Sequence, residues 1–449
     1  MKNLIQTLRN IFKISELKNR ILYTILLLAV YRLGTFIILP GIDSSALQAS
    51  LGGGSGPGGN LLDLFNTFLG GAFNRGSILA LGIMPYISAS IVVQLLGAVL
   101  PSIQRLRMEG ESGQKKMNQI TRYLTVAITL GQAASYITFL RGSFPGAITG
   151  SSTFFWITST VILTAGTLFL VWLGERITDN GIGNGVSLLI MIGIISGFPA
   201  AIIQEFSSTL PMIFFIEILA LGVVTMAVVA LTQATRKIPI NYARQMMGNR
   251  IGQLGRGNAA RQYIPLKVNS AGVMPIIFAQ AIMFLPTTLI QFSGAESLTG
   301  VAAALSDYTG FWYNLVFFLM IIIFTYFYTA ITVNPNEIAD QLKRNGGFIP
   351  GVKPGKKTAA YIDTVLSRIT LPGSIFLAFV SIFPAIATVM GATSGFAQFF
   401  GGTTLLIMIG VVLDTLQQIE SYLLMRHYDG LMQSGRVKGR ARSGSAIGV

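Results

Sequence analysis

Residues 212–233 read MIFFIEILALGVVTMAVVALTQ, an apolar run that carries one charged side chain, Glu217. About 20 mainly apolar residues are enough for a helix to cross a bilayer. Nine further runs of this kind occur along the chain. Together they predict ten membrane-spanning helices, at residues 20–39, 75–99, 119–140, 153–174, 184–204, 212–233, 271–291, 311–332, 370–390 and 402–425. The fold class predicted from this pattern is an all-α polytopic membrane protein.

The composition of the 449-residue chain supports a membrane protein and argues against an enzyme. Apolar residues make up 52% of it and charged residues 11%, against about 25% in soluble domains. The chain has no cysteine and one histidine, His427, which excludes disulfides and thiol chemistry and nearly excludes zinc sites and Ser-His-Asp triads. A phosphate-binding P-loop is also absent. We therefore expect no catalytic residue, no cofactor and no metal.

The charges predict the orientation of the spans. Lysine and arginine number 32 against 17 acidic residues, and they gather in alternate connections between the runs. Because basic loops stay in the cytoplasm, ten spans with both termini cytoplasmic fit every loop. The cytoplasmic parts are then an N-terminal segment, 1–19, a basic tail, 426–449, and two long loops at about 234–270 and 333–369. Such basic loops either serve topology and bind anionic lipid, or dock a large acidic or RNA-rich partner.

The first extracellular segment contains a candidate moving part. A glycine-rich tract at 52–59 precedes a short stretch in which Leu61, Leu64, Phe65 and Phe68 recur at helical spacing. Gly70 and Gly71 then interrupt the pattern. A helix of about nine residues is too short to cross a bilayer, so it lies at the interface or re-enters and is buried within protein. An interfacial helix and a movable stopper are both open at this point.

The predicted membrane interior holds few ionisable groups. Arg32, Glu217 and Asp414 form no readable pair or relay, whereas transporters of polar solutes usually carry such groups at depth. Neutral polar side chains are more frequent, and they either join helices or line an interface that opens. They include Ser88, Ser90, Gln94, Thr125, Thr129, Gln132, Gln280, Thr287 and Thr288.

Five motifs become informative when they are taken together and in order. They are ALGIMPYISASI at Ala80–Ile91, ERIT at Glu175–Thr178, GIGNG at Gly181–Gly185, IPLKVNSAGVMP at Ile264–Pro275 and GFIPG at Gly347–Gly351. Their sequences and spacings resemble the SecY family of bacterial protein-conducting channels, from about residue 18 to about residue 440. The chain departs from the family at Lys353, where the family has arginine, and in longer segments at 52–59 and 252–260.

The resemblance implies two inverted halves, 20–204 and 212–425, hinged at a loop at 205–211, with a re-entrant plug helix at about 61–70. It also assigns roles to residues of this chain. The pore ring would be Ile83, Ile87, Ile190, Ile194, Ile277 and Ile407. The plug would include Leu61, Leu64, Phe65, Asn66 and Phe68. The lateral gate would include Gln94 and Gln280. The docking loops would present Arg250, Arg256, Arg261, Lys353, Lys356 and Lys357.

The function implied by this resemblance is the central subunit of the Sec translocon, a passive gated channel for unfolded polypeptides in a bacterial inner membrane. It implies as partners the SecE and SecG subunits, the SecA motor, the ribosome, signal peptides and nascent chains, membrane lipids and an accessory insertase. The alternative class is a secondary transporter of a small solute, which is also built from inverted repeats. The scarcity of buried ionisable groups and the two long basic loops favour the channel.

Overall fold

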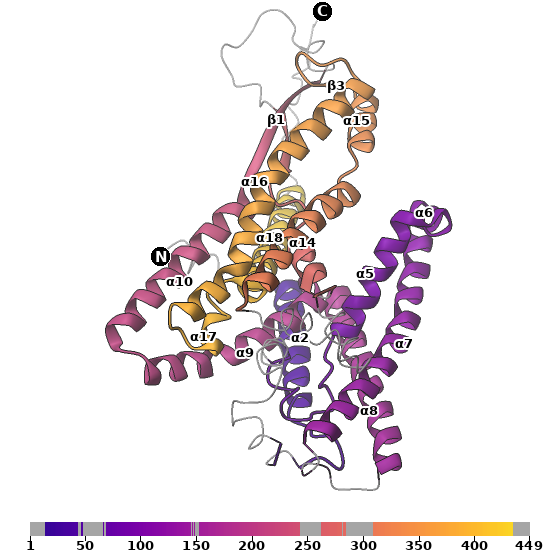
Figure 1. Cartoon of the computed structure of the whole chain (residues 1–449). Helices are drawn as coiled ribbons and strands as arrows, with labels where there is room; N and C mark the ends of the chain where they lie inside the picture. The colour runs from indigo at the N-terminus through magenta and orange to yellow at the C-terminus, as the bar shows by residue number, and fades with distance from the viewer. Residues whose placement is uncertain are drawn as a thin grey trace, which may run out of the picture.

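The structure is a computed structural model, and it describes residues 14–43, 46–47, 66, 69–144, 146, 148, 152–242, 262–280, 282–283 and 309–433. Long helices dominate it (Figure 1). In the first part of the chain they are α2 (Ser15–Gly34), α5 (Met84–Val99), α6 (Pro101–Met108), α7 (Glu111–Ser143), α8 (Ser152–Asn180), α9 (Gly185–Ser208) and α10 (Pro211–Gln233). In the second part they are α14 (Phe311–Thr332), α15 (Pro335–Arg344), α16 (Lys356–Val389), α17 (Ser394–Ala397) and α18 (Gly402–Gln433).

Seven of the described helices are long and apolar enough to cross a membrane. They are α7, α8, α9, α10, α14, α16 and α18. The other three predicted spans correspond to α2, to the shorter apolar helix α5, and to helical residues at 274–280 and 282–283. The prediction of an all-α polytopic membrane protein is thus confirmed as a fold class. Several helix boundaries differ from the predicted ones because of the local conformation of the backbone.

Helix α5 begins later than the predicted span at 75–99. Residues 69–82 form turns, and Gly76 and Gly82 adopt φ of 61° and 56°, a conformation that interrupts a right-handed helix. A Cβ on Gly82 would lie 2.1 Å from Leu69 Cδ2, so a larger residue there would also force the Leu69 side chain to move. Pro85 then occupies the first turn of α5, where its missing N–H costs nothing.

The connection between the two halves is shorter than the predicted loop at 205–211. Helix α9 continues to Ser208 and α10 begins at Pro211, so only Thr209 and Leu210 join them. Both joining residues are extended, and proline at the first helical position fixes the start of α10. Glu205, predicted in the loop, lies inside α9 and is fully buried.

The two long loops contain a small sheet, so the chain is not purely α-helical. Strands β1 (Thr235–Tyr242), β2 (Gln262–Lys267) and β3 (Gly347–Phe348) form an antiparallel sheet of order β2-β1-β3. In β1, Ile238 and Ile240 are buried while their neighbours are exposed, the alternation of a half-buried strand. These isoleucines pack with Leu342 of α15 and Ile362 of α16. The loop at 333–369 is likewise mostly folded, through α15, β3 and the extended start of α16.

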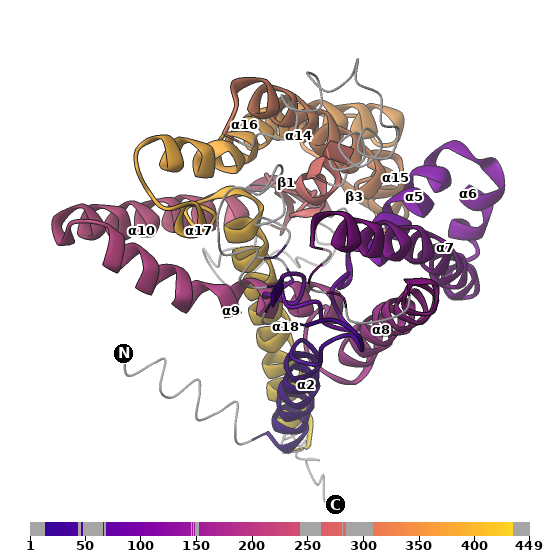
Figure 2. The same ribbon diagram turned by 60° about the horizontal axis from the view of Figure 1, so that its bottom comes forward.

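The buried core divides into clusters that draw on different parts of the chain. One apolar cluster joins residues of the first half, around Leu163 and Ile137, and another joins residues of the second half, around Ile321 and Leu377. A third, which we call the central cluster, draws on α2, α5, α8, α9, α18 and residues 396–400, and therefore belongs to both halves. Figures 1 and 2 show α9 and α18 near the middle of the molecule, where α9 packs against α18.

Candidate functional site

The six isoleucines of the predicted pore ring meet in the central cluster. Ile83 precedes α5 and Ile87 lies one turn into it, while Ile190 and Ile194 are one turn apart on α9 and Ile407 lies on α18. These five side chains are buried, and Ile277 is partly buried and packs against the central cluster. Residues more than 300 positions apart thus share one apolar contact region. Their role as a ring stays a prediction.

Aromatic residues that the sequence analysis did not single out also fill this region. Phe396, Phe399 and Phe400 are buried in the central cluster, although they lie in a connection between two predicted spans. The Phe399 ring lies 5.0 Å from that of Phe198 in α9, and the Phe396 ring lies 5.1 Å from that of Phe400. The repeated phenylalanines of the GFAQFFGG sequence are a signal that could have identified them. The connection is therefore part of the central packing.

The predicted plug is only partly visible. Leu61, Leu64, Phe65 and Phe68 lie outside the described residues, whereas Asn66 is described. The side-chain oxygen of Asn66 accepts a hydrogen bond from the backbone N–H of Asn74 at 3.2 Å, and its carbonyl accepts one from Gly71 at 2.9 Å. The helix-breaking role predicted for the two glycines agrees with their φ values of 62° at residue 70 and 85° at residue 71.

The C-terminal end of that segment is anchored between two helices of the first half. Arg32 Nη1 on α2 donates a hydrogen bond to the Gly70 carbonyl at 3.3 Å. A Cβ on Gly70 would lie 2.6 Å from Arg32 Nη1 and 2.8 Å from Ser196 Oγ on α9. Arg75 lies over the Phe36 ring at 4.4 Å, and Arg32 lies 5.6 Å from the same ring. Two guanidinium groups therefore flank one aromatic ring at this end of the segment.

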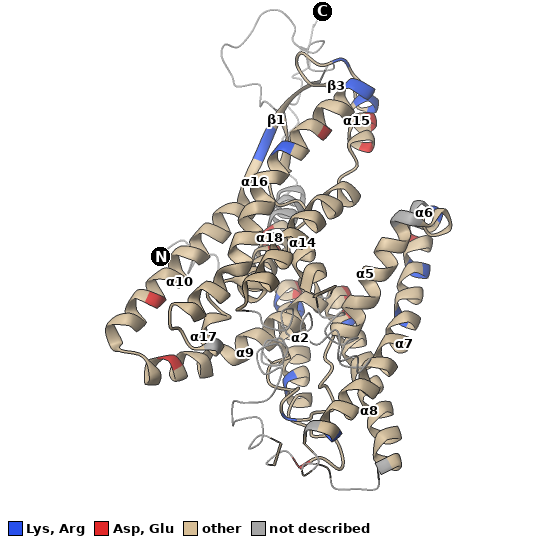
Figure 3. Ribbon diagram, viewed as in Figure 1, with Lys and Arg blue, Asp and Glu red and all other residues tan. Residues whose placement is uncertain are grey.

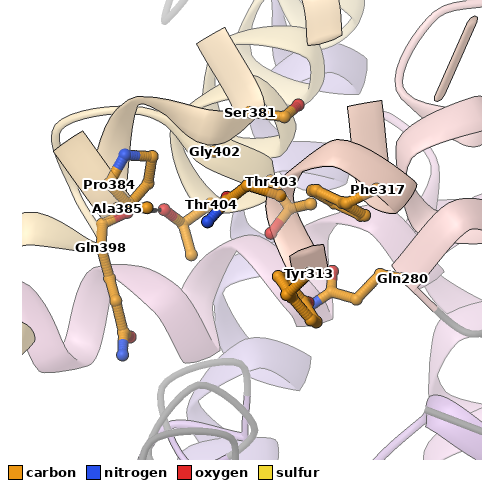
Figure 4. Close-up of a pocket in the computed structure, with 11 residues that line it drawn as sticks. Gln280, Tyr313, Phe317, Ser381, Pro384, Ala385, Gln398, Gly402, Thr403 and Thr404 are labelled. Carbon is orange, nitrogen blue, oxygen red and sulfur yellow. Dashed lines mark hydrogen bonds between the residues drawn. The ribbon is translucent and has the colours of Figure 1, made fainter. Parts of the chain in front are cut away.

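The two glutamines of the predicted lateral gate have different surroundings. Gln94 donates a hydrogen bond to Ser90 Oγ at 3.2 Å, one turn earlier in α5. Gln280 lines a cavity of about 40 Å³ between α14, α16 and the residues that lead into α18, and Figure 4 shows its amide beside Tyr313. Its Nε2 is buried and has no hydrogen-bond partner among the described residues. These contacts do not join the two glutamines, so their shared role in a gate stays a prediction.

Neutral polar side chains inside the long helices mostly serve their own helix. Thr125 and Thr129 on α7 donate hydrogen bonds to the carbonyls four residues earlier, at 2.7 and 2.6 Å. Thr325 and Thr329 on α14 repeat the pattern. Such bonds satisfy the hydroxyl donor without a partner helix, so these contacts do not require Thr125 and Thr129, two of the polar residues singled out above, to join helices.

The predicted docking residues divide into described and undescribed groups. Arg250, Arg256 and Arg261 lie outside the described residues. Lys353 is exposed at the turn before α16, Lys356 and Lys357 are exposed at its start, and Figure 3 shows Lys and Arg gathered near α15 and β3. Two lysines in the first turn of α16, with no acid there, oppose the helix dipole. The positive charge of these lysines is thus not explained by the stability of α16.

Comparisons with known proteins agree on one family. The model of a family described as SecY matches residues 77–416. The protein translocase subunit SecY of Chlamydia muridarum is 40% identical over 460 residues, covering 97% of this chain and 99% of that protein.

Two solved structures share the fold at low identity. A SecY structure described for a plug domain that stabilises the closed channel and maintains a membrane seal matches with a TM-score of 0.58 and 17% identity, covering 94% of each chain. Sec61 in a canine ribosome-channel complex from the endoplasmic reticulum matches with a TM-score of 0.58 and 15% identity, again covering 94% of each chain. At these identities the likeness concerns the fold.

Proposed function

The chain belongs to the SecY family of protein translocase subunits, and on this premise we propose that it forms the channel of the Sec translocon. It is a passive, gated pathway that passes unfolded secretory polypeptides across a membrane and releases apolar segments sideways into lipid. It performs no bond chemistry of its own. Its energy comes from a partner that pushes the polypeptide or from the membrane potential.

The observation that carries this function is the meeting of the six isoleucines between the two halves. Ile83 comes from the residue before α5, Ile87 from α5, Ile190 and Ile194 from α9, and Ile407 from α18, all in one packed apolar cluster with Ile277 against it. A narrow apolar constriction excludes water and therefore ions. Aliphatic side chains have no fixed polar partners to lose, so they can part around a polypeptide of any sequence and close again.

Two further parts complete the proposal. The segment at about 61–70 acts as a plug, and the anchoring of its last residues by Arg32 and Asn74 supports a tethered stopper. A related SecY structure is described for such a plug. The lateral gate lies between α5 and the helix around Gln280, whose buried Nε2 has no hydrogen-bond partner in the described part of the chain; this favours a surface that changes partners when the channel opens.

The proposed partners follow from the family and from the exposed lysines at the start of α16. We propose assembly with SecE and SecG, and docking of the SecA motor or the ribosome on the loops that carry Lys353, Lys356 and Lys357. The related Sec61 channel is described in a complex with the ribosome, whose RNA carries the charge that such lysines attract. We propose a bacterial inner membrane as its location on the basis of the family, and cytoplasmic termini on the basis of the alternating loop charges.

Reconstitution tests the function directly. Vesicles that hold this chain with SecE, SecG and added SecA should import an unfolded preprotein when ATP is present. Vesicles that hold SecE and SecG without this chain are the control. Uptake of a small solute without preprotein import would overturn the proposal in favour of the secondary transporter.

A further inference from the structure

The cavity beside Gln280 is small, but most of the side chains that line it are polar. It measures about 40 Å³ and lies within the second half, between α14, α16 and the residues that lead into α18 (Figure 4). None of the described residues that line it is charged, and none is an isoleucine of the predicted pore ring. The cavity is therefore separate from the central cluster and has a chemistry of its own.

The local backbone explains why a cavity forms at this place. Pro384 lies inside α16, where it removes a helical hydrogen bond and disturbs the helix. A Cβ on Gly402 would lie 2.9 Å from Pro384 Cγ, and Gly402 has a φ of 65°, so the chain that leads into α18 approaches α16 through a glycine. Ser381 and Ala385 are the neighbouring residues of α16 on this wall. Such small side chains leave space beside the proline.

One wall of the cavity presents a hydrogen-bond donor. The Gln280 side chain is 7% exposed, and its Nε2 has no hydrogen-bond partner among the described residues. Its amide lies beside Tyr313 of α14 (Figure 4). A buried amide N–H without a partner is costly, because folding removes the water that it would otherwise bind. This donor therefore requires an acceptor within the cavity.

The residues from α16 and α18 present acceptors. The Ser381 hydroxyl donates to the carbonyl four residues earlier in α16 at 2.8 Å, and the Thr404 hydroxyl donates to the Gln398 carbonyl. Both hydroxyl protons are thus engaged, but each oxygen keeps lone pairs that can accept a hydrogen bond. Thr404 is 1% exposed and Ser381 is 7% exposed. The cavity thus lies between a buried donor and buried acceptors.

The volume and the polarity of the cavity suit water. A buried water molecule needs about 10–15 Å³ of such a cavity and two to four polar partners, whereas an apolar cavity stays dry. The volume of about 40 Å³ has room for about two or three water molecules. A cation or an anion would need a charged partner, and the lining offers none.

We propose that this cavity is a hydration site of the second half, in which two or three water molecules accept a hydrogen bond from Gln280 Nε2 and donate to the Ser381 and Thr404 hydroxyl oxygens. The helix around Gln280 is then joined to α16 and α18 through water. A bridging water is nearly as favourable as a direct hydrogen bond, and it can change its orientation. The two walls can therefore shift slightly without leaving Gln280 unpaired. The site is independent of the proposed channel function.

The reactivity of a single introduced cysteine tests for water in the cavity. The chain has no cysteine, so each variant carries one thiol. T403C places it in the lining, and T325C places it on α14 away from the lining; the two threonines are 5% and 2% exposed. The probe is methyl methanethiosulfonate, a small uncharged reagent that reacts with the thiolate, the form that contact with water favours. Mass spectrometry of the chain in vesicles with SecE and SecG measures the rate.

We expect T403C to react at least about tenfold faster than T325C, because a dry apolar site keeps its thiol protonated. Equal rates would overturn the hydration site. S381C is a second reporter in the same lining, and it is used if T403C lowers the temperature of thermal unfolding in detergent.

Substitution of Gln280 tests whether its amide holds the water. In Q280L/T403C an apolar side chain replaces the donor and occupies its space, so the reaction should slow at least about threefold relative to T403C. Q280N/T403C keeps an amide and should stay within about twofold of T403C. An unchanged rate in Q280L/T403C would overturn the bridge to Gln280.

Cryo-electron microscopy of the wild-type complex, at a resolution that shows ordered water, tests the site directly. Density for water between Gln280 and the hydroxyls of Ser381 and Thr404 is the expected result. A protein side chain that is hydrogen-bonded to Gln280 in place of water would overturn the proposal.

Discussion

Helices α9 and α10 are neighbours in sequence and nearly equal in mean hydropathy, yet they lie in different surroundings. Eight residues of α9 are buried, including Ile190, Ile194 and the acidic Glu205, whereas Val228 is the one buried residue of α10, a helix that the structure describes throughout. Figure 1 shows α10 at the edge of the molecule and α9 running toward its centre. Hydropathy therefore identifies a membrane span but does not say whether the span faces lipid or the channel.

Polar substitutions should separate the two helices most strongly. Asparagine at both Ile190 and Ile194 puts four hydrogen-bonding groups into the central cluster, so water and ions should enter the closed channel and the resting ion conductance should rise well above wild type. The matched variant carries asparagine at Ile216 and Val223, which are 59% and 62% exposed on α10. Planar-bilayer conductance measures both variants.

An equal conductance in the α9 and α10 variants would contradict this prediction. It would show that Ile190 and Ile194 do not seal the channel, and it would remove the main support for the pore ring.

Glycine-to-alanine substitutions should have the next largest effect. A Cβ on Gly185 of α9 would lie 1.9 Å from the Gly174 carbonyl oxygen on α8, and that backbone atom cannot move aside cheaply. We expect G185A to lower the free energy of unfolding by about 3 kcal/mol. Gly222 of α10 has no atom within 4 Å of such a Cβ, so G222A should raise helix stability by about 0.5–1 kcal/mol.

Denaturant unfolding in detergent measures the glycine pair. If G185A were as stable as G222A, helices α8 and α9 would not pack as closely as their backbones indicate.

Much of the fold was available from the sequence because each span has a one-dimensional signature. The run at 311–332 coincides with α14, since apolar residues fill it and polar residues flank it. Strand β1 could also have been predicted, because apolar and polar residues alternate around Ile238 and Ile240. A search for long apolar runs does not detect this alternation. The shortened start of α5 depended on glycine conformations and on the close approach of Leu69, which are properties of three-dimensional packing.

The candidate site was less accessible to sequence reasoning. The isoleucines of the predicted ring have no feature that distinguishes them from the other isoleucines of the chain, so they were identified by motifs shared with a family and not by chemistry. Glu205 was expected in a loop because an acidic residue at the end of an apolar run usually marks a boundary. Its partner Thr393 lies 188 positions away, and no local pattern connects them.

The smallest expected effect concerns two threonines on either side of the α9–α10 connection. The Thr209 hydroxyl lies 2.5 Å from the Glu205 backbone carbonyl and 3.4 Å from Glu205 Oε1, so it donates mainly to its own helix and also lies beside a buried side-chain oxygen. Thr225 donates to the Leu221 carbonyl of its own helix at 2.7 Å. T209V should lower the free energy of unfolding by up to about 1 kcal/mol, because the buried Glu205 Oε1 loses a neighbouring donor. T225V should change it by less than about 0.5 kcal/mol, because that carbonyl keeps its helical N–H. Unfolding in detergent measures both, and equal values would mean that the buried Glu205 side chain is satisfied without Thr209.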